Sequence, residues 1–374
     1  MTDINSKALI YLISCALNEE KPERDRIEGA DLDVLLRMSR RHSVAAMAAD
    51  SVRKAGIEHE GFENERVKGT RKEILFRSAL TEVIDRLTEA GIWTCPLKGS
   101  VLRDLYPRPD MRTMADCDVL FDPAFRDKTK EIMESLGYET QHFGGLACHD
   151  VYHKEPIYNF ELHVSLFSSM HDEKLYEYYR DPEKLTRHTE DDPLRRYFDP
   201  EDLFVYMMAH EYKHYSQGGS GIRSLCDVYV FNRKYKGTLD RVYINQQLDK
   251  LGIREFAENN EMLADKLFSL GHELSGEEEK MLDYMMTSGT YGTMSHRVDN
   301  SVRNLGGGSR GRRRYLMKRI FMPLKEVEVQ YPFYYRHKVL LPVLPIHRGV
   351  KALVRRPKAI KHEIELLRKK KDLR

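Results

Sequence analysis

The sequence predicts an α+β fold, in which a small mixed sheet is flanked by an N-terminal and a C-terminal helical region. Apolar residues recur with a period of about 3.6 before residue 90 and again after about residue 171, as is typical of helices. Between these regions lie short runs rich in branched and aromatic residues, which favour strands. The chain of 374 residues shows no internal repeat, and its length allows two domains.

The individual elements follow in chain order. The first helices are expected over residues 7–17, 31–56 and 65–90. Strands are expected near residues 92–97, 117–121, 149–154 and 157–166, with a helix over 124–136 among them. Gly137 suits the end of that helix, and Asp199 with Pro200 suits the start of a later one. We expect four parts: an N-terminal helical region (1–90), a sheet-containing core (91–170), a helical domain (171–300) and a basic C-terminal tail (301–374).

Composition favours a cytoplasmic protein. No run of apolar residues approaches the roughly 18 that a membrane-spanning helix needs. The first residues lack the basic and apolar pattern of a secretory signal. The cysteines are odd in number and show no Cys-x-x-Cys spacing, so we expect reduced thiols; they are Cys15, Cys95, Cys117, Cys148 and Cys226.

A small-residue loop between a strand and a helix is suited to phosphate. A short helix is expected over 100–105, so Gly99 and Ser100 fall where the strand over 92–97 turns into it. Backbone N–H groups at a helix start bind phosphate oxygens, and glycine allows close approach. Lys98 either neutralises phosphate charge or caps the strand end.

Two carboxylates follow on the next strand. Asp116 and Asp118 are separated by one residue, so both point to the same face of an extended strand. Such a pair attracts Mg²⁺ or Mn²⁺, which retains substrate phosphates among its ligands. Asp-x-Asp alone is a weak motif in a chain with 59 acidic residues. Its position after the phosphate loop points to phosphoryl or nucleotidyl transfer.

A third carboxylate lies in the apolar strand over 157–166. Glu161 is flanked by Phe160 and Leu162, and His163 shares its face two residues on. A carboxylate there is costly unless it is paired, hydrogen-bonded or metal-bound. The alternative is a Glu161 that faces solvent on a half-buried strand.

These residues carry a resemblance to a known family. Gly99-Ser100, the Asp116/Asp118 pair and Phe160-Glu161-Leu162 resemble the three-part signature of the polymerase-beta-like nucleotidyltransferase superfamily. More narrowly, the chain resembles the bacterial uncharacterised nucleotidyltransferase family called NTP_transf_5, from about residue 5 to 350. The segments that carry this narrower resemblance are Leu97-Lys98-Gly99, Tyr106-Pro107, Arg112, the Asp116/Asp118 pair, Glu161-Leu162-His163, His210 with His214, and Gly221-Ile222-Arg223 to Asp227.

The resemblance implies a two-metal transfer of a nucleoside monophosphate from an NTP to an unidentified acceptor, a small molecule or a protein. Asp116 and Asp118 would hold Mg²⁺ on the triphosphate, and Glu161 would complete a second metal site that activates the acceptor. Gly99 and Ser100 would hold the terminal phosphates. The other residues expected to line the nucleotide or acceptor pocket are Lys98, Arg112, His163, His210, His214, Arg223 and Asp227.

A second motif competes with this interpretation. His210-Glu211-x-x-His214 matches the zinc-peptidase pattern, in which two histidines share one helix face. The extended motif fails because Gln217 and Ser220 occupy its later positions. No glutamate follows until Glu255, and Asp227 could in principle supply the third ligand. The remaining alternative is a histidine pair that packs against the core and is satisfied by Asp227.

The tail beyond residue 300 is basic. It holds 21 Lys and Arg against 5 Asp and Glu, a net charge of +16, whereas the first 300 residues carry −14. Such a tail suits an anionic membrane surface, nucleic acid being less favoured, and a non-catalytic adaptor is the third functional class. Alternatively the tail folds back on the acidic body. We expect 315–343 to pack, burying residues such as Phe321 and Phe333, and 351–374 to remain free.

Overall fold

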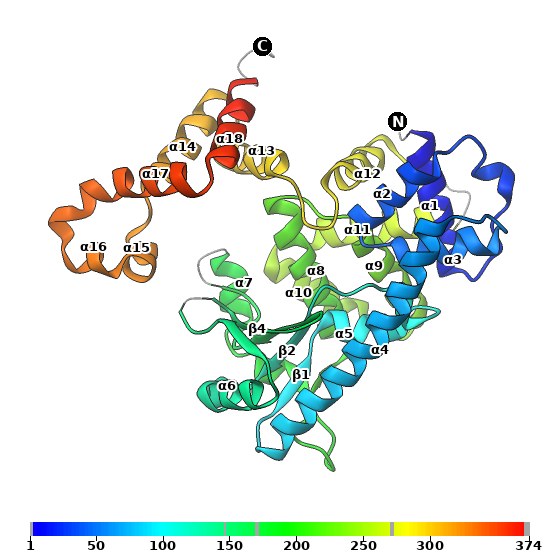
Figure 1. Ribbon diagram of the computed structural model, residues 1–374, viewed down its shortest axis with the longest axis horizontal. Helices are drawn as coiled ribbons and strands as arrows, with labels where there is room; N and C mark the ends of the chain where they lie inside the picture. The colour runs from blue at the N-terminus through cyan, green and yellow to red at the C-terminus, as the bar shows by residue number, and fades with distance from the viewer. Residues whose placement is uncertain (1–2, 146, 169–171, 270–272, 370–374) are drawn as a thin grey trace. The chain divides into compact units, whose positions relative to one another are not determined.

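The computed structural model describes residues 3–145, 147–168, 172–269 and 273–369 and divides into two compact units (Figure 1). Unit 1 comprises the chain up to Tyr212 together with Gly221–Thr290. Unit 2 comprises Lys213–Ser220 and the chain from Tyr291 onward. The architecture of unit 1 confirms the predicted α+β class.

The helices of unit 1 precede and follow the sheet in the sequence, except α5 and α6, which connect strands of the sheet. Their bounds are α1 Ile4–Leu17, α2 Leu32–Arg41, α3 Ala45–Lys54, α4 Glu60–Glu89, α5 Lys98–Leu102, α6 Arg126–Ser135, α7 Glu173–Tyr178, α9 Arg223–Lys234, α10 Arg241–Leu251, α11 Arg254–Phe268 and α12 Gly276–Ser288. Helix α8, Pro200–Gln217, contributes residues to both units. Short 3-10 turns lie at Arg24–Arg26, Arg103–Leu105, Pro109–Met111, Pro123–Phe125 and Pro182–Leu185.

The single helix expected over 31–56 is wrong, because a tight reversal separates α2 from α3. Ser43 has a φ of 55°, in the left-handed region. Its N–H donates to the carbonyl of Arg40, and the next N–H, of Val44, donates to Ser39. This is the hydrogen-bond pattern that ends many helices, usually with glycine at the left-handed position. The apolar periodicity continues across this reversal, so the sequence pattern did not indicate that the helix ends there.

Five strands form a mixed sheet in the order β1-β2-β5-β4-β3. Their bounds are β1 Thr94–Pro96, β2 Cys117–Phe121, β3 Glu139–His142, β4 His149–Lys154 and β5 Tyr158–His163. The central pair β2 and β5 is parallel, whereas the other neighbours are antiparallel. The four expected strands are present, but β3 and a small separate pair, β6 Thr186–Arg187 with β7 Tyr197–Phe198, were not expected.

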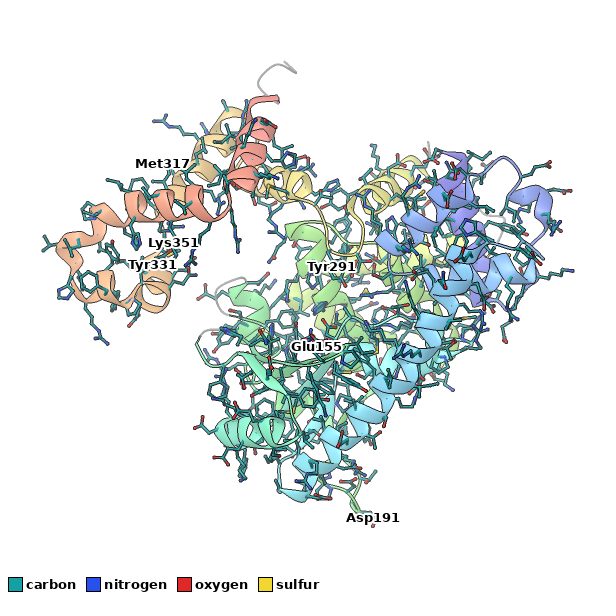
Figure 2. The ribbon with its side chains drawn as sticks, in the orientation of Figure 1. Glu155, Asp191, Tyr291, Met317, Tyr331 and Lys351 are labelled. Atoms are coloured by element: carbon teal, nitrogen blue, oxygen red, sulfur yellow. The ribbon has the colours of Figure 1, made fainter. Side chains whose placement is uncertain are left out.

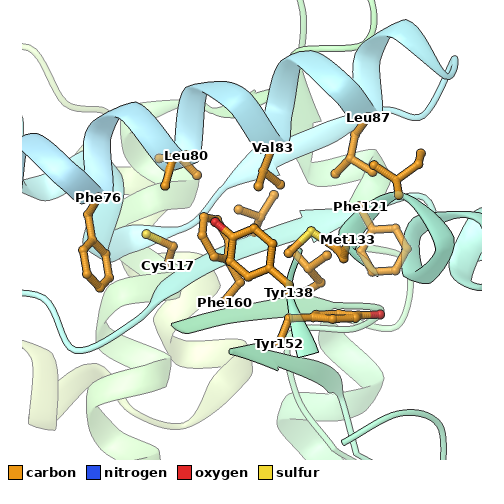
Figure 3. Close-up of a cluster of buried hydrophobic side chains, with 14 of the residues drawn as sticks. Phe76, Leu80, Val83, Leu87, Cys117, Phe121, Met133, Tyr138, Tyr152 and Phe160 are labelled. Atoms are coloured by element: carbon orange, nitrogen blue, oxygen red, sulfur yellow. The ribbon is translucent and has the colours of Figure 1, made fainter. Parts of the chain in front are cut away.

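Helices α4 and α6 cover one face of this sheet (Figure 3). The buried side chains between them are Phe76, Leu80, Val83 and Leu87 of α4, Met133 of α6, and Cys117, Phe121, Tyr152 and Phe160 of the strands. Because side chains alternate along a strand, the residues between these core positions point to the opposite face. The carboxylates of β2 and β5 are therefore displayed away from the apolar core.

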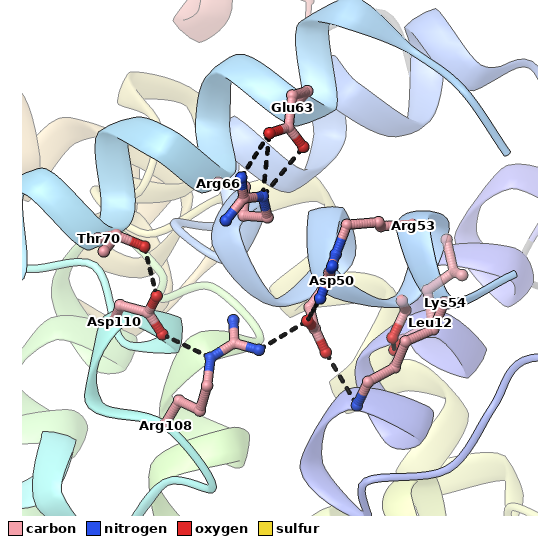
Figure 4. A network of polar contacts seen from close by, with 10 residues as sticks. Leu12, Asp50, Arg53, Lys54, Glu63, Arg66, Thr70, Arg108 and Asp110 are labelled. Carbon is pink, nitrogen blue, oxygen red and sulfur yellow. Dashed lines mark hydrogen bonds and ion pairs between the residues drawn. The ribbon is translucent and has the colours of Figure 1, made fainter. Parts of the chain in front are cut away.

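A polar network fixes the loop that enters β2 (Figure 4). The Asp50 side chain of α3 is fully buried, and Arg108 donates to it at 2.7 Å while Lys54 pairs with it at 3.0 Å. Arg108 also binds Asp110, which accepts a hydrogen bond from Thr70 of α4 at 2.6 Å. These contacts anchor the segment that carries the next residue of interest, Arg112, to two N-terminal helices.

Unit 2 contains α13 Met294–Asn304, α14 Gly308–Ile320, α15 Leu324–Gln330, α16 Pro332–Arg336, a 3-10 turn at Lys338–Val343, α17 Leu344–Arg355 and α18 Pro357–Lys369. Helix α18 is tied to α14, because Glu363 accepts hydrogen bonds from Tyr315 at 2.5 Å and from Arg319 at 2.8 and 2.9 Å. Within the described residues, no helix is long and apolar enough to cross a bilayer.

The distal segment was expected to remain free, and this is wrong for its described residues, 351–369. Within unit 2, Phe321 and Phe333 are more than half exposed. The distal segment is instead held through Glu363, whose two oxygens match the guanidinium of Arg319. Figure 2 marks Met317, Tyr331 and Lys351 on this unit. Residues 370–374 lie outside the described part.

Candidate active site

Two carboxylates and an imidazole meet on the sheet face opposite the core. Asp118 of β2 and Glu161 of β5 are direct partners in the parallel register, so their side chains lie next to each other. His163 follows two residues later on the same face. The ligand atoms of Asp118, Glu161 and His163 all lie within 4.8 Å of one another. The alternation argued from sequence therefore brings these three side chains together.

An ion pair joins Asp118 to His163. Nε2 of His163 lies 2.9 Å from Oδ1 of Asp118 and 3.9 Å from Oε2 of Glu161. Burial alone would raise the pKa of Asp118, but the hydrogen bond and charge of His163 lower it to about 2. Burial would likewise lower the pKa of His163, and the same hydrogen bond raises it to about 10. His163 thus orients Asp118 in its ionised form.

Asp116 lies immediately before β2, and its carboxyl pKa is raised, whereas that of Asp118 is lowered. Burial and the neighbouring Asp118 charge raise its carboxyl pKa. The pKa of Glu161 is also raised, by burial and by the Asp118 charge. Among the described residues, Asp116 is not part of the group whose ligand atoms lie within 4.8 Å of one another.

The segment that was predicted to bind phosphate lies in the first turn of α5, because this helix begins two residues earlier than expected. The helix starts at Lys98, so Gly99 and Ser100 belong to its first turn. The N–H of the preceding Leu97 donates to the carbonyl of Asp118 at 3.0 Å, which fixes the loop to the carboxylate strand. Burial lowers the pKa of Lys98, while the nearby Asp118 charge opposes that shift.

The hydroxyl of Ser100 is buried and has no hydrogen-bond partner within the described residues. A buried hydroxyl without a partner costs about 1–3 kcal/mol, and a hydrogen bond to a bound ligand would offset this cost. The charge of Asp118 adds to burial in raising the pKa values of Asp116 and Glu161, and a bound cation would relieve this repulsion. Their oxygen donors suit a hard cation such as Mg²⁺.

A buried ion pair contacts the backbone at Gly99. Arg112 donates from Nε and Nη2 to the two oxygens of Asp227 on α9, at 2.8 and 2.9 Å. Its Nη1 donates to the carbonyl of Gly99 at 3.3 Å, and Tyr106 donates to Asp227 at 2.6 Å. Burial would raise the pKa of Asp227, but the Arg112 charge lowers it. Both residues expected in the nucleotide pocket are therefore engaged with each other.

The remaining predicted residues lie on α8 and at the start of α9. Arg223 donates to the carbonyl of Thr113 at 3.1 Å, in the loop that enters β2. His210 lies with its ring centroid 6.1 Å from that of Tyr206, and His214 follows it one helical turn later. Asp227, which could serve as a third zinc ligand or as the partner of the histidine pair, is bound through both carboxylate oxygens by Arg112.

Two further residues at this face were missed by the sequence analysis. His149 of β4 pairs with His163 in the antiparallel register, and its Nε2 lies 3.4 Å from Oε2 of Glu161. Sγ of the adjacent Cys148 lies 3.5 Å from Nδ1 of His149. Burial would raise the pKa of this thiol, but the neighbouring imidazoles of His149 and His163 lower it to about 5. Pairing the two expected strands as a hairpin would have brought His149 towards Glu161.

Comparison with known proteins identifies the family. The model of NTP_transf_5, described as uncharacterised nucleotidyltransferase, matches residues 28–269. No curated protein and no solved structure matches the chain. The match covers more than half of the chain and includes every strand of the sheet. The protein therefore belongs to this nucleotidyltransferase family and is an enzyme of that class.

Proposed function

We propose that this nucleotidyltransferase uses Mg²⁺ or Mn²⁺, held by Asp116, Asp118 and Glu161, to transfer a nucleoside monophosphate from an NTP. The acceptor is a hydroxyl or phosphate group of a small molecule or a protein. The observation that carries the proposal is the hydrogen bond from Leu97 to the Asp118 carbonyl, at 3.0 Å, because it ties the phosphate loop to the carboxylate strand. The carboxylates that would hold the cation and the N–H groups that would donate to phosphate oxygens are therefore supplied side by side.

Each residue has a defined part in this proposal. A bound divalent cation would neutralise triphosphate charge and lower the pKa of the acceptor hydroxyl. The first turn of α5 presents N–H groups and the Ser100 hydroxyl to the terminal phosphates. Lys98 adds a positive charge beside them, and His163 keeps Asp118 ionised and oriented. Pyrophosphate leaves as the acceptor oxygen bonds to the α-phosphorus.

We assign Arg112 and Asp227 the role of positioning the phosphate loop. Arg112 holds the Gly99 carbonyl with the same guanidinium that binds Asp227, so the ion pair fixes the backbone of the phosphate loop. Arg223 steadies the loop before β2 in the same way, through Thr113. His210 and His214 stay proposed as a wall of the nucleotide or acceptor pocket, on the family resemblance.

The proposal is tested with NTPs labelled at the α-phosphate. Purified protein is incubated with each NTP, Mg²⁺ or Mn²⁺, and fractionated cell extract, and labelled products and pyrophosphate are measured. We expect a metal-dependent product that retains the α-label and releases pyrophosphate. In a parallel incubation with NTPs labelled at the γ-phosphate, transfer of that label would indicate a kinase. The absence of NTP binding with either metal would favour the adaptor class.

Glu161→Gln should separate chemistry from nucleotide binding. We expect kcat to fall by about 10²-fold or more, because the carboxylate acts mainly on the acceptor, while NTP affinity changes little. Steady-state rates and equilibrium NTP binding measure the two effects. Glu155→Gln, in the exposed turn of the same hairpin (Figure 2), is the matched control. A collapse of NTP affinity with a normal kcat would reject the proposed role of Glu161 in activating the acceptor.

We further propose that unit 2 associates with anionic lipid. Helix α17 exposes the apolar side chains of Ile346, Val350, Leu353 and Val354, whose spacing places them along one stripe. Lys351 and Arg355 on the same helix are also exposed. An exposed apolar stripe with basic neighbours suits the interface of an anionic bilayer.

Ile346→Glu/Val350→Glu should weaken co-sedimentation with vesicles of anionic phospholipid by at least about 10-fold, since each side chain loses apolar contact and adds repulsion. Val242→Glu/Met262→Glu, at exposed apolar positions of unit 1, is the control pair. Binding should also fall as salt rises and be weaker on uncharged vesicles. Equal binding by both pairs, or binding to nucleic acid alone, would reject a lipid partner.

A further inference from the structure

We propose that Cys148, His149 and His163 bind a borderline-soft divalent cation such as Zn²⁺, at a site beside the carboxylates. We call these three residues the thiol-imidazole cluster. Their ligand atoms lie within 4.8 Å of one another, and Sγ of Cys148 is 3.5 Å from Nδ1 of His149. Thiolate sulfur and imidazole nitrogen are preferred zinc ligands, whereas Mg²⁺ takes oxygen. The cluster thus differs in chemistry from the carboxylate site.

His163 supplies the second observation that points to a cation. The residue is 8% exposed, and its Nδ1 is buried with no hydrogen-bond partner within the described residues. Its Nε2 is already engaged by Asp118 at 2.9 Å, so Nδ1 is the nitrogen left for a metal. Zinc-bound histidines usually give their other nitrogen to a carboxylate, which orients the ring and raises its basicity. His163 and Asp118 have this arrangement.

His149 repeats the pattern from the neighbouring strand. Its Nε2 lies 3.4 Å from Glu161, and its Nδ1 faces the Cys148 thiol. About a quarter of the His149 side chain is exposed, which leaves a path for an ion to enter. Three protein ligands with one open position are typical of zinc sites that exchange water or substrate.

The fold holds the cluster together by backbone contacts. The antiparallel register of β4 and β5 places His149 opposite His163. The carbonyl of Cys148 accepts hydrogen bonds from the N–H groups of Val164 at 2.9 Å and Ser165 at 3.2 Å, which continues this pairing past the end of β5. The backbone pairing of β4 with β5 therefore positions the three proposed zinc ligands, without a long loop.

Binding of Zn²⁺ and Co²⁺ to the full-length, metal-free protein tests the inference. We expect one Zn²⁺ per chain by titration calorimetry, and a thiolate-to-cobalt charge-transfer absorption with Co²⁺. Cys148→Ala and His149→Ala should each lower zinc affinity by at least about 100-fold, and the first should remove the cobalt absorption. The matched controls are Cys95→Ala, a buried cysteine of β1, and His153→Ala, further along β4. Both should bind zinc as the unmodified chain does.

Three other outcomes would overturn it. One is a chain that binds no zinc, and another is unchanged zinc affinity in both Cys148→Ala and His149→Ala. The third is loss of zinc binding in His210→Ala, which would move the metal to the H-E-x-x-H motif. Asp118→Asn removes only an outer partner of His163, so it should weaken zinc by about 10–100-fold while the cobalt absorption persists. Circular dichroism of each variant confirms that the fold is kept.

Discussion

Replacing Asp116 or Asp118 with asparagine should abolish metal-dependent transfer, with a loss of about 10³-fold or more. Each carboxylate is proposed to hold the cation that neutralises the triphosphate, and such stabilisation is worth several kcal/mol of the barrier, at about 1.4 kcal/mol for each tenfold. An amide keeps the shape of the side chain but removes its charge. Label transfer from an α-labelled NTP, measured over a range of Mg²⁺ and Mn²⁺ concentrations, gives the loss.

The same two variants should differ in stability, because their carboxylates have different surroundings. The pKa of Asp116 is raised by burial and by Asp118, so removing its charge should leave the free energy of unfolding unchanged or increase it. Asp118 is stabilised by His163, and its asparagine variant loses a buried ion pair and should unfold more easily. Urea unfolding without metal separates the two cases.

Asp122→Asn is the matched control for both. Asp122 follows the other end of β2 and accepts a hydrogen bond from the N–H of Ala124, which an asparagine oxygen can also accept. Its transfer activity and stability should both stay near those of the unmodified chain. If the Asp116 and Asp118 variants retain transfer while this control behaves as expected, the metal assignment is wrong.

Much of the sheet face could be read from local pattern. Strand alternation alone places Glu161 with His163 and separates Asp118 from its apolar neighbours, and the structure confirms both. The parallel pairing of β2 with β5 could not be read in this way, because register depends on contacts between distant segments. The short strand β3 has mostly exposed positions, so it lacks the alternation that would reveal it.

Other features lie beyond any local signal. Arg112 and Asp227 are 115 residues apart, and neither has a periodic context that predicts a partner. The break at Ser43 interrupts a helix without the glycine that usually marks one. In the tail, composition suggested few apolar contacts for the distal segment. A single acidic side chain, Glu363, holds it to α14 instead.

Removing the charge of Asp227 should cause the largest loss of stability. The Asp227 and Arg112 side chains are 11% and 4% exposed, so Asp227→Leu leaves a buried guanidinium without its counter-ion. Such a loss costs about 3–5 kcal/mol, whereas breaking the exposed pair of Lys128 and Glu131 with Glu131→Gln should leave unfolding unchanged. Urea unfolding measures both, and an Asp227→Leu variant as stable as the control would contradict the burial argument.

A compensated variant distinguishes support of the fold from support of the phosphate loop. Arg112→Met/Asp227→Leu/Tyr106→Phe removes the ion pair together with the hydroxyl that donates to Asp227. Buried ion pairs that are replaced by apolar residues commonly regain stability. The Gly99 carbonyl still loses the hydrogen bond from Arg112, so the loop is no longer fixed. We therefore expect near-normal unfolding with a KM for NTP raised about 10-fold or more, because a charged hydrogen bond contributes about 1.5–3 kcal/mol. Recovery of both stability and nucleotide affinity would show that the ion pair serves the fold alone.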